Sequence, residues 1–209
     1  MDKQDSDNAK TAGAKTAGAK TAGSDLSVFD LDEFITCLRK AVTAPSPAKA
    51  IRAEMDRYFE NPEAVRQAMP TFDTDEETLF EDETVSIFYC RFRPNYTIPP
   101  HDHQTSAVIG IYEGQERNNF FTTAGDAFIT KGKSVDMQAG DVLSIGPNAI
   151  HTVECTGSTP SYGIHVYLAP LSRIERNLYD VAAQMVIPFT DADFQRLVSD
   201  DEATVSSQA

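Results

Sequence analysis

All four histidines of this 209-residue chain lie between residues 101 and 165. His101 and His103 are separated by one residue, so that on a β-strand both imidazoles point to the same face. His151 lies on a later predicted strand, after a Gly-Pro-Asn turn. Three imidazoles from two strands can bind one side of a divalent metal ion and leave positions open for a substrate and for oxygen. The alternative is three core histidines, each hydrogen-bonded to the backbone.

The glycines and the proline around these histidines resemble the two motifs of the cupins, which are double-stranded β-helix barrels. The first cupin motif places His-x-His at a fixed distance before a glycine, and the interval from His103 to Gly114 agrees with it. The second motif runs from a glycine through a proline to a third histidine, as Gly140, Pro147 and His151 do, although the proline falls one residue late. The resemblance implies that the three histidines hold a metal ion.

One ligand of the usual cupin pattern is missing. Counting back from Gly114, the position of the cupin glutamate is Ala107, which cannot bind a metal. Three neutral imidazoles leave a ferrous ion its full charge, which suits an anionic thiolate. Cysteine dioxygenases and related thiol dioxygenases use such a site, and the segment 101–114 is similar to their bacterial members. The resemblance covers about residues 76–170 and implies an Fe(II) enzyme that oxidises a small thiol, cysteine or a related one, with O₂ to a sulfinate.

A second element of this resemblance lies on the strand predicted over 161–168. Gly163, His165 and Tyr167 share one face of that strand. In cysteine dioxygenases a Ser-x-His-x-Tyr element directs its tyrosine hydroxyl at the iron site, and its histidine supports the hydroxyl. This chain matches the element except at the serine, so the resemblance implies catalytic roles for Tyr167 and His165. The alternative is a core histidine and a barrel aromatic with its hydroxyl at the rim.

The sequence departs from the family at the group that binds the substrate carboxylate. Cysteine dioxygenases use an arginine on an upstream strand, and alignment by hand places Glu76 at that position. Arg91 and Arg93 are nearby, but we expect them to be exposed charges on an edge strand. Mammalian members also cross-link the tyrosine to a cysteine at the position of Ala107, so no thioether can form here. The choice between cysteine and a thiol without a carboxylate therefore stays open.

Two other functions are compatible with the same motifs. One is a different metal-dependent cupin enzyme, such as an isomerase, a lyase or a carbon-cleaving dioxygenase that uses Fe, Mn, Ni or Zn. The other is a non-enzymatic metal or small-molecule sensor, or a storage protein. The missing glutamate, together with His165 and Tyr167, favours thiol oxidation.

The elements that must position these residues follow from the pattern of apolar side chains. We predict a mainly β cupin barrel, a double-stranded β-helix or jelly roll, over residues 76–170. Its strands are predicted near residues 77–81, 84–93, 97–103, 106–113, 116–122, 127–130, 134–138, 141–146, 149–155 and 161–168. Charged residues at 113, 116 and 117 flank a turn, and we expect them at the surface. Cys90 and Cys155 are predicted to be small buried hydrophobes.

Segments with other patterns precede and follow the barrel. Residues 1–24 contain a pentapeptide in three copies and read as a disordered tail, with a tethering role as the alternative. Residues 25–72 predict an N-terminal helical cap, with helix starts at Asp30, Ser46 and Asn61. Residues 171–209 predict an extension with one short helix after Thr190 and an acidic tail.

The overall charge excludes several partners. Lysine and arginine total 18 against 32 aspartates and glutamates, which gives a net charge of −14. So acidic a chain repels nucleic acid and anionic lipid. No apolar run is long enough to cross a membrane, and three cysteines form no disulfide framework. We therefore expect a cytoplasmic monomer or homodimer whose partners are a small thiol and O₂.

Overall fold

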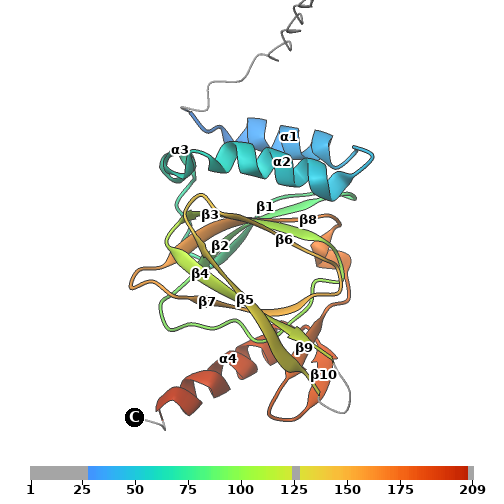
Figure 1. The fold of residues 1–209 in the computed structure, drawn as a ribbon, viewed down its shortest axis with the longest axis vertical. Coiled ribbons are helices and arrows are strands. Elements are labelled where there is room, and N and C mark those ends of the chain that lie inside the picture. Colours follow the sequence, from blue (N-terminus) through green and yellow to red (C-terminus); the bar gives the residue numbers. More distant parts are fainter. Residues whose placement is uncertain (1–27, 124–127, 207–209) are drawn as a thin grey trace, which may run out of the picture.

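Two antiparallel β-sheets form the centre of the molecule in the computed structural model, which describes residues 28–123 and 128–206 (Figure 1). The tail predicted over residues 1–24 lies outside the described residues. The larger sheet has the strand order β1-β2-β8-β3-β6 and the smaller sheet has the order β5-β4-β7. The strands are β1 (Glu76–Glu81), β2 (Ser86–Phe92), β3 (Ala107–Glu113), β4 (Gln115–Thr122), β5 (Thr130–Gln138), β6 (Val142–Ile145), β7 (Ile150–Cys155) and β8 (Ser161–Tyr167). The mainly β class is thus confirmed.

Both faces of the larger sheet are covered, which explains why its central strands are apolar almost throughout. One face of β8 carries Ile164 and Val166, which pack against the helices. The opposite face carries His165 and Tyr167, which point into the barrel. The alternation predicted for this strand therefore separates a structural face from a face that can carry chemistry.

Three helices cover the outer face of the larger sheet (Figure 1): α1 (Leu31–Ala41), α2 (Pro47–Phe59) and α3 (Pro62–Ala68). The predicted caps of α1 and α3 are confirmed, because the side chains of Asp30 and Asn61 accept hydrogen bonds from Glu33 N and Ala64 N. Ser46 precedes Pro47 at the start of α2, but its side chain makes no capping hydrogen bond. The helices bury an apolar stripe against the sheet.

Glycines are required where elements approach closely. A Cβ at Gly110 on β3 would lie 2.6 Å from the ring of Phe59, so only glycine lets α2 pack onto this strand. Gly114, in the turn between β3 and β4, has a φ of 80°, and a Cβ there would lie 2.6 Å from Pro160 O. The backbone conformation and the close packing at this turn therefore explain why the first predicted motif has a glycine here.

The structure departs from the predicted strands in two places. Residues 97–103 form no regular strand, and single bridges join Thr97 to Glu154 and His101 to both His151 and Leu178. Pro99 and Pro100 have no N–H to donate, which interrupts a ladder at this point. The strands predicted over 127–130 and 134–138 are replaced by the single strand β5, and residues 124–127 lie outside the described part.

The extension after the barrel contains more than the predicted helix. A 3₁₀ turn (Leu171–Arg173) leads to a hairpin of β9 (Asn177–Asp180) and β10 (Met185–Pro188), which the sequence analysis missed. The predicted helix is confirmed as α4 (Asp191–Ser206), although the side chains of the acidic tail lie outside the described part. None of the described helices is both long and apolar enough to cross a bilayer.

Candidate metal centre

The three predicted ligands come together inside the barrel. His101 Nε2 lies 3.1 Å from His103 Nε2, and His151 Nε2 lies 3.3 Å from the same atom. All three side chains are buried. Although residues 97–103 form no strand, the bridge between His101 and His151 brings the two segments side by side, with backbone hydrogen bonds of 3.0 Å in both directions.

Hydrogen bonds on the far side of two rings fix which nitrogen faces the centre. His101 Nδ1 donates to the carbonyl of Pro99 and His151 Nδ1 donates to Asn118 Oδ1, both at 2.9 Å. In neutral rings the two Nε2 atoms then carry lone pairs directed at His103. A neutral His103 can offer a hydrogen to only one of them. A cation at the centre would satisfy all three nitrogens.

The spacing of the nitrogens fits a first-row transition metal. Imidazole nitrogens bind such ions at about 2.1 Å, so two of them at tetrahedral or octahedral angles lie about 3.0–3.4 Å apart. The two close distances in the triad fall in this range. Burial lowers the pKa of all three histidines, that of His101 to about 4, which keeps the rings neutral and ready to bind a metal.

Asp102 holds the segment that carries the first two ligands. Its carboxylate is 1% exposed and accepts hydrogen bonds from Asn177 N at 3.0 Å, Asn177 Nδ2 at 2.9 Å and the Tyr179 hydroxyl at 3.0 Å. Gln104 Nε2 donates a fourth, at 2.8 Å. These bonds tie the loop to β9 and occupy the carboxylate, so that Asp102 does not join the triad.

In the described residues, no aspartate, glutamate or cysteine completes the group formed by the three histidines. Ala107, at the position of the cupin glutamate, is buried on β3 opposite Tyr167 of β8. The ring of Tyr167 lies 4.9 Å from that of His103. The ring of a phenol therefore stands beside the triad, and Ala107 supplies no carboxylate.

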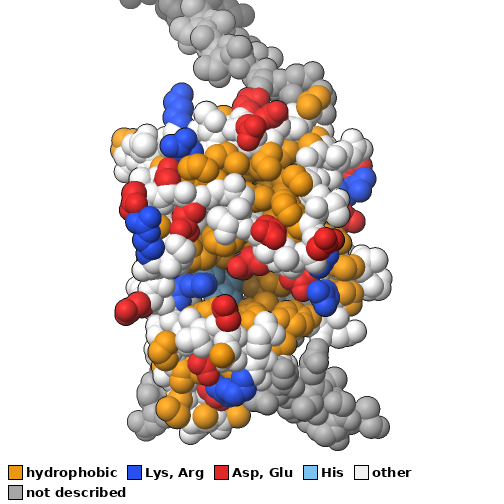
Figure 2. Space-filling view, turned by 180° about the vertical axis from the view of Figure 1, so that it is seen from behind, with side chains coloured by type: hydrophobic (Ala, Val, Ile, Leu, Met, Phe, Trp, Pro, Cys, Tyr) orange, Lys and Arg blue, Asp and Glu red, His pale blue; other side chains and the backbone are white. Residues whose placement is uncertain are grey.

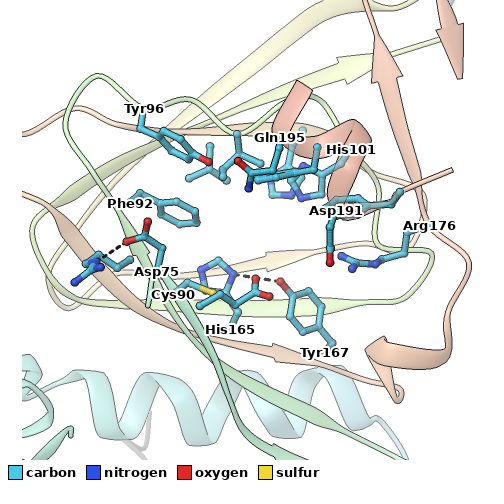
Figure 3. Close-up of a pocket in the computed structure, with 17 residues that line it drawn as sticks. Asp75, Cys90, Phe92, Tyr96, His101, His165, Tyr167, Arg176, Asp191 and Gln195 are labelled. Atoms are coloured by element: carbon cyan, nitrogen blue, oxygen red, sulfur yellow. Dashed lines mark hydrogen bonds and ion pairs between the residues drawn. The ribbon is translucent and has the colours of Figure 1, made fainter. Parts of the chain in front are cut away.

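Tyr167 and His165 form a pair within the barrel. His165 Nδ1 lies 3.3 Å from the Tyr167 hydroxyl (Figure 3). Burial raises the pKa of Tyr167 and lowers that of His165 to about 3, so both side chains are neutral at physiological pH. His165 Nε2 has no hydrogen-bond partner in the described chain. Gly163, which stands at the serine position of the Ser-x-His-x-Tyr element, offers no hydroxyl to it.

A cavity of about 290 Å³ leads from the surface to His101 and His151. Figure 2 shows it as a hollow with a histidine at its floor and charged side chains around its rim. Its apolar wall includes Phe92, Ile98, Phe189 and Phe194. Its polar wall includes Glu76, His165, Tyr167, Arg176, Asp191 and Gln195. The wall thus combines residues of the barrel and of the C-terminal extension.

The sequence analysis missed an arginine of this cavity. Arg176 immediately precedes β9, and its guanidinium lies 4.2 Å over the ring of Phe189. Within the described chain, no carboxylate forms an ion pair with it. Arg91 and Arg93, the arginines considered from the sequence, both bind Asp75, at 2.6 and 2.7 Å. Arg91 was expected to be exposed on an edge strand, but β2 is an inner strand and Arg91 is partly buried and also lines the cavity. No motif marks Arg176, because a short hairpin brings it to the barrel.

Two residues of β4 were also misjudged or overlooked. Glu116 was predicted to be exposed, but it is fully buried and accepts a hydrogen bond from Ser161 Oγ at 3.0 Å. Asn118, the acceptor of His151, was not singled out. Strand alternation places both on the inner face. Because both side chains are polar, the pattern of hydrophobic residues did not indicate that this face is buried. Cys90 and Cys155 are buried and free, as predicted.

No family model matches the sequence, and no curated protein is significantly similar to it. Solved structures with a similar fold include an RmlC-like cupin with a double-stranded β-helix from Methanocaldococcus jannaschii, with 14% identity over 50% of this chain and 91% of that chain and a TM-score of 0.41. A conserved double-stranded β-helix protein from Klebsiella pneumoniae has 17% identity over 55% of this chain and 92% of its own, with a TM-score of 0.40.

An oxalate decarboxylase from Bacillus subtilis has 21% identity over 42% of this chain, with a TM-score of 0.37, and this chain spans only 22% of its length. These are likenesses of fold. The described residues themselves define a mainly β barrel with a buried group of three histidines that could hold a metal ion.

Proposed function

We propose that this protein is an Fe(II)-dependent thiol dioxygenase that converts a small thiol and O₂ into a sulfinate and a proton (RSH + O₂ → RSO₂⁻ + H⁺). The observation that carries the proposal is a triad made only of imidazoles that could hold a metal ion, with the ring of Tyr167 beside it. Neutral ligands do not compete with an anionic thiolate for the charge of the metal.

His101, His103 and His151 would hold the iron through their Nε2 atoms. The chemistry that ferrous iron supplies in such a site is the acidification of a bound thiol and the activation of O₂. Pro99 and Asn118 keep the hydrogens of two rings on Nδ1, away from the centre. The protein thereby presents lone pairs to the metal without first having to lose protons.

Tyr167 would donate a hydrogen bond to the substrate. Because burial raises its pKa, the hydroxyl keeps its proton at neutral pH. His165 holds the hydroxyl through Nδ1 and is itself held in the barrel by burial. Phe92, Phe189 and Phe194 limit the access of water to the reacting sulfur.

Arg176 is the side chain in the cavity best suited to bind a substrate carboxylate. Its guanidinium is fixed by stacking on Phe189 and has no ion-pair partner among the described residues. Arginine binds carboxylates with two parallel hydrogen bonds. Arg176, from the C-terminal extension, would therefore bind the carboxylate of cysteine, which Glu76 cannot do. The proposal places this reaction in the cytoplasm, where thiols stay reduced.

Oxygen uptake by the iron-loaded protein tests this function. We expect uptake with at least one of L-cysteine, 3-mercaptopropionate and cysteamine, none without thiol, and a sulfinate product in a 1:1 ratio to O₂, as the equation requires. His151→Ala should lose both bound iron and uptake, because two imidazoles remain. Absence of uptake with every thiol, in protein that retains iron, would instead favour another metal-dependent reaction.

A further inference from the structure

Glu76 brings into the cavity a carboxylate that the metal centre does not use. It begins β1, and its partner across the sheet is Cys90, which is buried inside the barrel. Because directly paired residues of antiparallel strands point to the same face, the side chain of Glu76 also faces the interior. It lines the cavity with His101 and Tyr167 and remains accessible to solvent from there.

The two neighbouring carboxylates of this wall differ in what they bind. Asp75 is paired with Arg91 and Arg93, at 2.6 and 2.7 Å. The side chain of Glu76 has no such partner, since it forms no hydrogen bond or ion pair within residues 28–123 and 128–206. Burial raises its pKa and the more distant Arg176 lowers it. Glu76 is thus an accessible carboxylate in the cavity wall that can pair with a cationic ligand.

Other groups of the same wall are also ready for a polar ligand. His165 is 4% exposed, lines the cavity and leaves Nε2 without a partner in the described structure. Figure 3 shows Arg176 and Asp191 on one side of Tyr167 and Asp75 on the other. Glu76 and Arg176, which can bind a cation and an anion, line the same cavity as Tyr167.

We propose that Glu76 binds the ammonium group of the substrate and thereby selects an aminothiol. The inference rests on the proposed function, which supplies the thiol of the substrate, and adds that the substrate must also carry a positive charge. Cysteamine and L-cysteine both hold an ammonium two carbons from sulfur, and both are small enough for a cavity of about 290 Å³. In L-cysteine the carboxylate would also meet Arg176. 3-Mercaptopropionate has the carboxylate of L-cysteine, which can also meet Arg176, but it lacks the ammonium group and leaves Glu76 without a cation.

Binding without turnover tests this assignment. Thiols are titrated into the zinc-loaded protein without O₂, and the heat of binding is measured, because zinc accepts thiolates but does no redox chemistry. Wild-type protein should bind L-cysteine more tightly than 3-mercaptopropionate, which differs from it only by lacking the ammonium group. Glu76→Gln keeps the shape and removes the charge. It should weaken cysteamine and L-cysteine by about 10- to 100-fold, the range for a hydrogen bond between charged groups, and leave 3-mercaptopropionate unchanged or tighter.

Glu77→Gln is the matched control. Glu77 is the next residue of β1, points to the other face and accepts a hydrogen bond from Thr74 Oγ1 at 2.7 Å. Its substitution should leave all three affinities unchanged. Arg176→Gln then distinguishes the two aminothiols. If the variant loses affinity for L-cysteine alone, the substrate is an amino acid. If the variant and wild type both bind L-cysteine and cysteamine equally well, the substrate is a simple amine.

The assignment is overturned if Glu76→Gln weakens all three thiols equally, or cysteamine by less than about twofold. If this variant does not fold, a wild-type preference for 3-mercaptopropionate over L-cysteine overturns it as well. Oxygen uptake reports on the proposed function separately. Ammonium-dependent binding without uptake would retain the Glu76 site and refute the dioxygenase, whereas uptake with equal affinity for all three thiols would refute the Glu76 site alone.

Discussion

The orientation of single nitrogen atoms determines whether this centre can bind a metal. Asn118 Oδ1 accepts the hydrogen of His151 Nδ1 and so turns the lone pair of Nε2 toward the other rings. Asn118 is itself fully buried and donates to Met137 Sδ at 3.5 Å. An amide that is fixed in this way cannot easily be replaced by water, so its contribution should be measurable as metal affinity.

Asn118→Leu should lower the affinity for Fe(II) or Zn(II) by about 10- to 100-fold, because the ring of His151 loses the partner that sets its tautomer. Titration against a competing chelator measures this affinity. Asn119→Leu is the control. Asn119 is also buried on β4, but it bonds Thr152 and Ser134 on the outer face, so its loss should affect stability and not metal binding. Equal losses in the two variants would contradict the role given to Asn118.

Glu116 links the stability of the barrel to pH. Burial raises its pKa to about 8 from an ordinary value of 4.5, so the folded protein binds a proton that the unfolded chain has released. The free energy of unfolding should therefore fall as pH rises from about 4.5 to about 8, by up to about 1.4 kcal/mol per pH unit. The histidines act in the opposite sense below about pH 6.5, because burial lowers their pKa values.

Glu116→Gln isolates the contribution of this carboxyl. Glutamine keeps the acceptor for Ser161 and never ionises, so relative to wild type the variant should gain stability as pH rises from about 5.5 to about 7.5. Urea unfolding at several pH values measures the difference. Glu33→Gln, on the exposed side of α1, should follow the wild-type profile. A pH-independent difference between Glu116→Gln and wild type would contradict the buried, proton-binding state.

At the scale of elements, the contact of α2 with β3 depends on the absence of one side chain. Gly110→Ala should destabilise the protein by about 1–3 kcal/mol, because the new Cβ would lie 2.6 Å from the ring of Phe59 and 2.9 Å from Met55 Cε. Denaturant unfolding measures this. Gly146→Ala, where no atom lies within 4 Å, should change stability by less than about 0.5 kcal/mol. Metal content should be unchanged in both, and similar stability losses would contradict the packing argument.

The strands that carry the site could be predicted where alternation is strict, as on β8, where His165 and Tyr167 oppose Ile164 and Val166. The three histidines could be found because imidazoles are rare in this chain and their spacing is distinctive. The loop around His101 could not, because its form depends on Asp102 bonding a hairpin 75 residues later. Arg176 could not be predicted as a cavity residue for the same reason, since only tertiary structure brings it to the cavity.

The whole molecule carries a net charge of −14 and therefore repels itself. Its ion pairs are mostly at the surface, as between Arg66 and Glu63 or Arg173 and Glu83, and such pairs contribute little. Raising NaCl from about 0.05 to about 0.5 M should therefore raise Tm, because screening of the repulsion outweighs the weakened pairs. Thermal melts measure this, with choline chloride as a second salt to exclude a sodium-specific effect. A fall in Tm with both salts would contradict the expectation.

The hairpin of β9 and β10 and the helix α4 bring Arg176, Asp191 and Gln195 to one wall of the cavity, while the histidines belong to the barrel. The same hairpin also holds the histidine loop, because Asn177 and Tyr179 donate hydrogen bonds to Asp102. A change of sequence in the hairpin would therefore alter the shape of the cavity and the spacing of the imidazoles together, so that neither could evolve independently of the other.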